Sequence, residues 1–156
     1  MTGESELTFS DLDEADQDLC RLAREAAAGA YAPYSRFAVG AAILTATSAT
    51  YAGANLENAS YGLTICAEAA ALAAANTAGD REIRTVAVVG FPIAGVPGRA
   101  PVITPCGRCR QMIAEFAGPA QDVRILCCAA DYGRVLATTI GELLPHAFEP
   151  QSLPRF

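Results

Sequence analysis

Apolar residues along the first half of the chain recur at two different spacings, which predict helices and strands in turn. Small apolar residues repeat at helical spacing over residues 10–28, and Gly29 follows as a C-cap. The runs 38–46 and 48–57 have extended character and together predict a β-hairpin. An alanine-rich run from Cys66 to Ala78 predicts a second helix, which ends at Gly79.

The second half of the chain alternates strands with helices. Residues 83–90 predict a buried strand, 91–100 a loop rich in proline and glycine, and 101–104 a further short strand. Residues 106–118 predict a helix, 122–129 a strand, and 138–145 a short helix in which Thr139 and Glu142 have the spacing of a capping box. Strands separated by helices predict a single layered α/β domain over residues 1–156, with a hairpin near its start.

Composition and charge argue against several classes of protein. Of the 156 residues, 52% are hydrophobic and 18% are charged, and the formal net charge is −6. An acidic surface repels phosphate backbones, so we expect no nucleic-acid partner. We expect no membrane association, because no stretch approaches roughly 18 consecutive apolar residues. The acidic N-terminal segment lacks the apolar core of a signal peptide, so we expect a cytoplasmic protein whose six cysteines are reduced thiols.

Three of these cysteines stand where the two inner helices are predicted to begin. The stretch TPCGRCRQ contains Cys106 and Cys109, and TICAEAAA contains Cys66. The C-x-x-C pair alone is compatible with a redox disulfide, a structural zinc or part of a catalytic metal site. The positive end of a helix lowers the pKa of thiols and favours thiolate ligands. Three ligands leave one tetrahedral position open, as in catalytic zinc sites and unlike closed structural ones.

Glu68 lies two residues after Cys66. A carboxylate at that position can reach the open side of the metal without being a ligand, and it can carry protons there. C-x-E followed by P-C-x-x-C is the pattern of zinc deaminases. Two other classes stay open at this point. One is a non-catalytic zinc-binding module, which needs no Glu68, and the other is a dithiol redox protein.

Four stretches, in order, resemble the signatures of the homotetrameric cytidine deaminase family: YAPYSRFAVGAA, GANLENASYGLTICAE, PCGRCRQ and ELLPHAFEPQSL. The resemblance implies a three-layer α-β-α fold with a central mixed sheet of about five strands. It also implies zinc-dependent hydrolytic deamination of cytidine and deoxycytidine in pyrimidine salvage. One Zn²⁺ per subunit and a homotetramer with shared active sites are implied as well.

The resemblance also assigns roles to individual residues. Zinc would be held by Cys66, Cys106 and Cys109, and Glu68 would be the proton shuttle. The substrate contacts would come from the ribose-binding pair Asn55 and Glu57, the backbone of Ala67 at the base edge, Phe37 against the pyrimidine, Tyr61 near the nucleoside at a subunit contact, and Phe148 reaching into a neighbouring subunit's site. PCGRCRQ also resembles blasticidin S deaminase, a family member without the ribose-binding pair. A modified cytosine nucleoside is therefore the second substrate expectation.

The sequence departs from the family at Ala69, where members with three cysteines usually carry arginine. Three thiolates give a zinc site negative charge, and a unit charge about 4 Å away contributes about 4 kcal/mol at an effective dielectric of 20. Our hypothesis is that Arg108, which stands between the two C-x-x-C cysteines, supplies this charge by donating to thiolates of the other helix. The alternative is a solvated surface arginine. We expect packing roles for Cys20, Cys127 and Cys128, and no role for His146.

Overall fold

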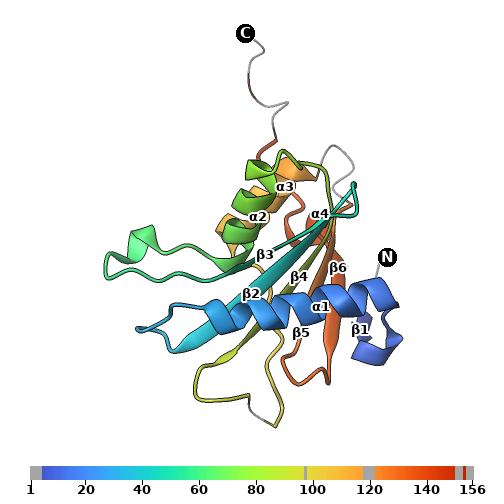
Figure 1. Ribbon diagram of the computed structural model, residues 1–156. Coiled ribbons are helices and arrows are strands. Elements are labelled where there is room, and N and C mark those ends of the chain that lie inside the picture. The colour runs from blue at the N-terminus through green and yellow to red at the C-terminus, as the bar shows by residue number, and fades with distance from the viewer. Residues whose placement is uncertain (1–4, 97, 118–121, 150–152, 154–156) are drawn as a thin grey trace.

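A computed structural model describes residues 5–96, 98–117, 122–149 and 153 (Figure 1). A mixed six-stranded sheet forms its centre, with strand order β1-β6-β5-β4-β2-β3. Strands β4 and β5 pair in parallel, and all other neighbouring strands of the sheet are antiparallel. The strands are β1 (Ser5–Leu7), β2 (Phe37–Thr45), β3 (Thr50–Ala54), β4 (Ile83–Pro92), β5 (Arg124–Cys128) and β6 (Val135–Thr139). The helices are α1 (Glu14–Ala26), α2 (Ala67–Thr77), α3 (Gly107–Phe116) and α4 (Ile140–Leu143), with 3-10 turns η1 (Phe9–Asp11), η2 (Ala27–Gly29) and η3 (Tyr61–Leu63).

Helices cover both faces of the sheet, with α1 on one face and α2 and α3 on the other (Figure 1). The side chains of β4 divide between these layers with the strand period of two. Val86 and Val88 pack in the core beneath α2 and α3, whereas Ala87 and Val89 pack in the core beneath α1. A parallel strand pair is usually buried on both faces in this way. The predicted α/β fold with three layers is confirmed.

The first turn of α2 lies close against the neighbouring strand β3. A Cβ atom on Gly53 would stand 2.6 Å from the carbonyl oxygen of Ala67 and 2.5 Å from the amide nitrogen of Ala71. Only glycine permits this approach of helix to strand. The contact fixes the N-terminus of α2, and with it the positions of Cys66 and Glu68.

The helices agree with the sequence except at the two ends of α1. Gly29 is not its C-cap, because α1 ends at Ala26 with Ala27 as C-cap, and residues Ala27–Gly29 form the 3-10 turn η2. Asp13 is the N-cap of α1 and accepts a hydrogen bond from the amide of Asp16 at 2.9 Å, so α1 begins later than predicted. The preceding residues form η1 instead, and a capping box of Thr8 and Asp11 stands at its N-terminal end. As predicted, α2 is followed by Gly79, which has a φ of +83°. The predicted end of α3, at Gly118, lies outside the described residues.

Three predictions about strands were incomplete or wrong. No strand forms over residues 101–104, where Pro101 and Pro105 frame the segment and have no amide hydrogen for a ladder. The antiparallel strand β6 was not predicted, although the helix that follows it has the predicted capping box at Thr139 and Glu142. The short edge strand β1 was also missed, and it makes the sheet six strands rather than about five. Among the described residues, no helix has both the length and the apolar character needed to span a membrane.

Candidate active site

The three cysteines singled out by the sequence come together where α2 and α3 begin. Cys66 is the N-cap of α2, Cys106 is the N-cap of α3, and Cys109 lies in the first turn of α3. Their three sulfur atoms all lie within 4.8 Å of one another, and those of Cys66 and Cys106 are 3.8 Å apart. The predicted cluster of thiols is therefore present in the fold.

The spacing of these sulfur atoms fits a tetrahedral zinc ion. With zinc–sulfur bonds of about 2.3 Å, neighbouring ligand sulfurs stand about 3.8 Å apart. Within the described part of the chain, no fourth His, Cys, Asp or Glu joins the group. Cys109 is buried and Cys106 is exposed, so one side of the cluster opens to solvent. The donor set is that of a metal site with a free fourth corner.

Glu68 lies in the first turn of α2 with only 4% of its surface exposed. Burial raises the pKa of its carboxyl group, and hydrogen bonds from its own backbone and from the Cys109 side chain oppose that rise. The interaction with Cys109 places the carboxyl group beside the thiol cluster. Glu68 therefore stands where the sequence predicted a proton shuttle.

The thiols differ in pKa although all three lie near helix N-termini. Burial raises the pKa of Cys66, and burial followed by the charge of Glu68 raises the pKa of Cys109. For Cys106 burial also acts upward, but hydrogen bonds from Cys109 and Cys66 outweigh it and leave the pKa below its usual value. Of the three thiols, only Cys106 thus has a lowered pKa, and hydrogen bonds within the cluster are the cause. A divalent cation removes this difference because thiols bound to it lose their protons.

Backbone pairing brings the NLEN segment next to the cysteines. Leu56 and Ile65 exchange two backbone hydrogen bonds of 2.9 Å, and Ile65 directly precedes Cys66. On its other side the segment pairs with Tyr31, whose amide donates to the Asn55 carbonyl oxygen at 3.0 Å. The amide of Glu57 in turn donates to the Tyr31 carbonyl oxygen at 2.8 Å. The predicted ribose-binding pair therefore flanks Leu56, whose bridge partner Ile65 directly precedes Cys66.

Asn55 has a structural role that the sequence did not reveal. Its Oδ1 accepts a hydrogen bond from the Val39 amide at 2.9 Å, and its Nδ2 donates to the Phe37 carbonyl oxygen at 3.0 Å. The carboxamide thus continues the sheet beyond the end of β3 and fixes the start of β2, where half-buried Phe37 stands. One Nδ2 hydrogen and further acceptor capacity on Oδ1 are left for a ligand.

Glu57 organises the loop before β2. Its Oε2 accepts hydrogen bonds from the amides of Tyr34 at 2.9 Å and Ser35 at 3.2 Å. The pKa of Glu57 lies below its ordinary value, chiefly because the Ser35 side chain also donates a hydrogen bond to the carboxylate. Burial has a smaller opposing effect, and the two amides lower the pKa further. A cavity of about 330 Å³ adjoins this carboxylate, and its lining is Tyr34, Ser35, Glu57, Tyr61 and Thr64. Tyr61 is 74% exposed, and its ring lies 5.8 Å from that of Tyr34.

Arg108 reaches from α3 to the loop before α2. Its Nη1 donates to the carbonyl oxygen of Thr64 at 3.3 Å, two residues before Cys66. Within the described residues, no hydrogen bond joins its guanidinium to a thiol. The side chain therefore connects the two cysteine-bearing segments, and any effect on the sulfur atoms acts through space.

Arg110 and Gln111, the two residues that follow Cys109 in α3, connect the C-x-x-C segment to the C-terminal segment. Arg110 donates to the carbonyl oxygens of Pro105 at 2.8 Å and Leu143 at 3.1 Å, and to Thr104 Oγ1 at 3.0 Å. Gln111 pairs with the backbone of Phe148, whose ring is exposed. Sequence reasoning noted Arg110 and Gln111 only as parts of the PCGRCRQ signature.

The remaining cysteines and the histidine lie apart from the cluster. Cys20, Cys127 and Cys128 are fully buried among apolar side chains, as predicted, and burial raises the pKa of Cys127 to about 12. His146 is exposed and lies outside the group of three thiols.

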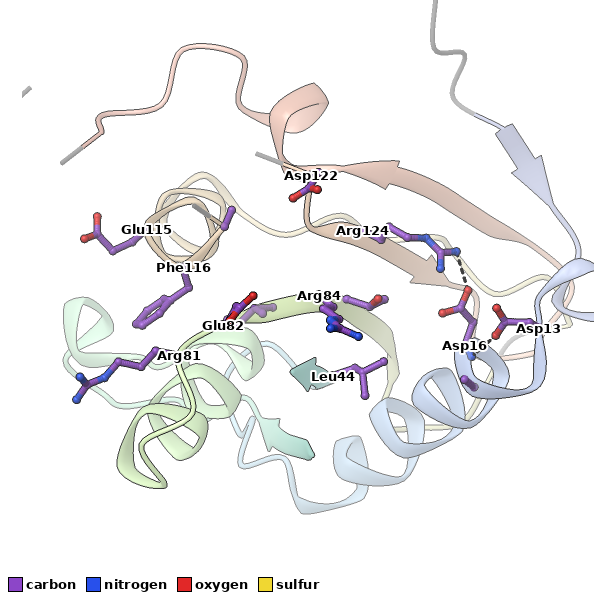
Figure 2. Close-up of a pocket in the computed structure, with 14 residues that line it drawn as sticks. Asp13, Asp16, Leu44, Arg81, Glu82, Arg84, Glu115, Phe116, Asp122 and Arg124 are labelled. Carbon is purple, nitrogen blue, oxygen red and sulfur yellow. Dashed lines mark hydrogen bonds and ion pairs between the residues drawn. The ribbon is translucent and has the colours of Figure 1, made fainter. Parts of the chain in front are cut away.

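A second cavity, of about 1070 Å³, lies at the opposite end of α3 from Cys106 (Figure 2). None of the predicted site residues lines it. Its charged side chains are of both signs, and Arg124 is paired with Asp16 at 2.6 Å. The charged lining residues are Asp13, Asp16, Arg81, Glu82, Arg84, Glu115, Asp122 and Arg124. This cavity is separate from the thiol cluster.

Comparison with known proteins identifies relatives over most of the chain. Residues 13–127 match the family model for the cytidine and deoxycytidylate deaminase zinc-binding region. A cytidine deaminase of Mycobacterium tuberculosis is 43% identical over 133 residues, which cover 85% of this chain and 89% of that protein. The crystal structure of cytidine deaminase from Burkholderia pseudomallei superposes with a TM-score of 0.75 at 39% identity, covering 88% of this chain and 100% of that chain. A blasticidin-S deaminase of Bacillus cereus is 32% identical over 139 residues, 88% of this chain and 94% of that protein.

Proposed function

Because this chain belongs to the cytidine and deoxycytidylate deaminase family, we propose that it catalyses the hydrolytic deamination of cytidine and deoxycytidine to uridine and deoxyuridine with release of ammonia. The observation that carries the proposal is the combination of three clustered sulfurs, a free fourth corner and the buried carboxyl group of Glu68. A zinc-binding module without activity needs neither the free corner nor the carboxyl group. A dithiol redox protein needs only the C-x-x-C pair.

Cys66, Cys106 and Cys109 would hold one Zn²⁺ per subunit. Bound zinc would supply a Lewis acid that lowers the pKa of water to roughly 7. Glu68 would accept a proton from the attacking water and pass it to N3 of the cytosine ring, so that C4 becomes electrophilic. The same carboxyl group would then take the remaining proton from the hydroxyl group added at C4 and deliver it to the amine, so that the C4–N bond breaks and ammonia leaves. Its buried place beside Cys109 excludes bulk water from these transfers.

Residues of the NLEN segment, the first turn of α2 and the cavity lining would together hold the nucleoside. The spare Nδ2 hydrogen of Asn55 and the free oxygen of Glu57 would bind the ribose hydroxyl groups, since one oxygen of Glu57 is already engaged by the Tyr34 and Ser35 amides. The Ala67 amide, in the unpaired first turn of α2, would donate to the base. Phe37 would pack on the pyrimidine ring, and Tyr61 would close the outer side.

A modified cytosine nucleoside is the second candidate substrate. The similarity to a blasticidin-S deaminase over 88% of the chain favours it. The presence of both Asn55 and Glu57 favours an ordinary ribose instead, because two hydroxyl groups of a sugar suit this pair of polar side chains. The two substrates therefore differ in what they demand of the NLEN segment.

We also propose a homotetramer with shared active sites, acting in pyrimidine salvage in the cytoplasm. Large apolar side chains are exposed on both sides of the cavity, on residues 31–34 and on the 56–65 loop that extends from the body of the domain (Figure 1). Exposed patches of this kind usually belong to an interface. The members are Tyr31, Tyr34, Leu56, Tyr61, Leu63 and Ile65. A second copy seated here would complete the outer wall of the cavity and bring its own Phe148 close.

The test is a spectrophotometric screen of the purified zinc-loaded protein against cytidine, deoxycytidine, cytosine, cytidine monophosphate and blasticidin S. We expect loss of the cytosine absorbance and release of ammonia with the two nucleosides. Turnover of blasticidin S in preference to both would favour the second candidate. No turnover of any of the five by a metal-loaded protein would overturn the proposal. Light scattering during chromatography measures the number of subunits.

A further inference from the structure

The side chain of Gln111 forms two complementary hydrogen bonds with the backbone of one residue, Phe148. Its Oε1 accepts from the Phe148 amide at 3.1 Å, and its Nε2 donates to the Phe148 carbonyl oxygen at 2.8 Å. A carboxamide that pairs with both backbone groups of a residue fixes the orientation as well as the position of that residue. The ring of Phe148 makes no comparable anchor, because it is 60% exposed.

Arg110 holds the other end of the same short segment. Its Nη1 donates to the carbonyl oxygen of Leu143 at 3.1 Å, at the end of α4. The five residues that follow Leu143 lead to Phe148, so two adjacent side chains of α3 hold both ends of this stretch. A short segment fixed at both ends has few conformations to lose when a ligand or another subunit orders it.

The same helix carries two of the three clustered thiols. Cys109 lies two residues before Gln111, and Cys106 is the N-cap of α3. The place of Phe148 is thereby fixed relative to the metal site through a single helix, although 37 residues separate Phe148 from Gln111 along the chain.

We propose that Gln111 is a positioning residue, whose carboxamide holds the backbone of Phe148 on the metal-bearing helix so that the Phe148 ring takes a fixed place for nucleoside binding. This inference rests on the proposed deaminase function for its consequence and on the two hydrogen bonds for its geometry. The side-chain oxygen and nitrogen of Gln111 are both engaged by the Phe148 backbone, so its role is one of positioning. It acts on KM through Phe148.

The experiment compares Gln111→Leu, which removes both hydrogen bonds at similar volume, with Gln111→Glu, which keeps an acceptor for the Phe148 amide. Glu115→Gln, one turn later on the exposed side of α3, is the matched control. Exchange of the Phe148 amide hydrogen is followed by NMR, and cleavage of the bond after Phe148 by chymotrypsin is followed by mass spectrometry. Zinc content, thermal midpoint, kcat and KM are measured on the same zinc-loaded samples.

In Gln111→Leu we expect amide exchange and chymotrypsin cleavage at Phe148 to accelerate roughly tenfold, as loss of a net hydrogen bond or two implies. KM rises several-fold, while kcat and zinc content stay close to wild type. Gln111→Glu retains more of the Phe148 protection than Gln111→Leu, and Glu115→Gln matches wild type.

Unchanged exchange and cleavage at Phe148 in Gln111→Leu would overturn the proposal. A joint fall in kcat and zinc content with unchanged KM would overturn it too, because Gln111 would then act on the metal helix itself. A wild-type protein without deaminase activity would instead refute the proposed function. The exchange of the Phe148 amide would still decide whether Gln111 holds it.

Discussion

The sulfur atoms of Cys66 and Cys106 lie 3.8 Å apart although 40 residues separate the two cysteines in the sequence. Each is the N-cap of a different helix, and α2 and α3 share one layer and one apolar core over the sheet. The thiol cluster is therefore formed by tertiary packing, and it exists only when both helices are packed on the sheet. Its loss should be separable from loss of the fold at Cys106, whose side chain is exposed.

Replacing Cys106 with serine is expected to remove the metal and leave the fold intact. Serine is nearly isosteric, and the exposed position creates no cavity, but a neutral hydroxyl is a poor zinc ligand beside two thiolates. We expect zinc retained after dialysis against a chelator to fall at least about tenfold, measured by elemental analysis. Cys20→Ala is the control, because Cys20 lies on the buried face of α1, and its truncation should lower stability without loss of zinc. Equal zinc in Cys106→Ser and wild type would contradict the assigned ligand set.

Glu68→Gln is expected to keep zinc and lose turnover. The amide has the shape of the carboxyl group but cannot accept and release the proton that the reaction moves from water to the base. General acid–base groups contribute a factor of roughly 10²–10⁴ to the rate, so kcat for ammonia release should fall by a factor of about 10² or more. Glu82→Gln, at an exposed position directly before β4, is the matched control and should keep wild-type kcat. Loss of zinc from Glu68→Gln would make Glu68 a part of the metal shell instead of a proton shuttle.

Arg108→Ala tests whether the arginine of the C-x-x-C loop offsets the charge of three thiolates. Its guanidinium donates a hydrogen bond to the carbonyl oxygen of Thr64, two residues before Cys66, and not to a sulfur atom. Its effect on the sulfur atoms is therefore electrostatic. A unit charge several ångströms away contributes a few kcal/mol at an effective dielectric of about 20. We expect zinc to transfer to a competing chelator roughly ten to a hundred times faster and turnover to fall, with Arg108→Lys intermediate.

Arg84→Ala, on an exposed position of β4, is the control for loss of one positive charge. If Arg108→Ala keeps both the wild-type rate of zinc transfer and the wild-type dependence of turnover on pH, the arginine is a solvated surface residue. The positive charge that other family members carry at the position of Ala69 would then have no replacement at Arg108.

The parts of the site that the sequence predicted are those where residue type and chain position suffice. Cys66 and Cys106 stand at helix starts that composition and spacing could locate, and two helices on one face of a sheet bring their N-termini together. The hydrogen bonds of Gln111 and Asn55 were not predictable in this way, because each joins a side chain to a backbone whose place depends on tertiary packing. The spacing of hydrophobic residues along the chain does not show which distant backbone group a polar side chain will bind.

The same limit explains the errors in the fold. Strand β6 covers only Val135–Thr139 and runs straight into α4, so its residues resembled the approach to a helix. Residues 101–104 have strand-like composition, but the prolines at 101 and 105 leave them outside the ladder. The predicted helix start at Ser10 failed because Asp13, three residues later, captures the Asp16 amide. Each error lies where a local signal competes with a neighbouring one.

Asn55→Asp is expected to destabilise the fold as well as weaken substrate binding. The aspartate keeps an acceptor for the Val39 amide but turns a second oxygen toward the Phe37 carbonyl oxygen, where Asn55 donates at 3.0 Å. An acceptor facing an acceptor loses that bond and leaves both groups poorly satisfied, which costs about 1–3 kcal/mol of the free energy of unfolding. Chemical denaturation of both proteins at one fixed concentration measures the difference.

Asn58→Asp is the matched control, three residues further along the same segment. The Oδ1 of Asn58 accepts from the Ser60 amide at 2.8 Å, and an aspartate oxygen makes the same turn contact. We expect its free energy of unfolding to stay within about 0.5 kcal/mol of wild type. Because the two substitutions are chemically identical, only the donation from Asn55 to β2 separates them. Equal stability of the two variants would show that Asn55 does not hold the start of β2, and would leave ribose binding as its sole role.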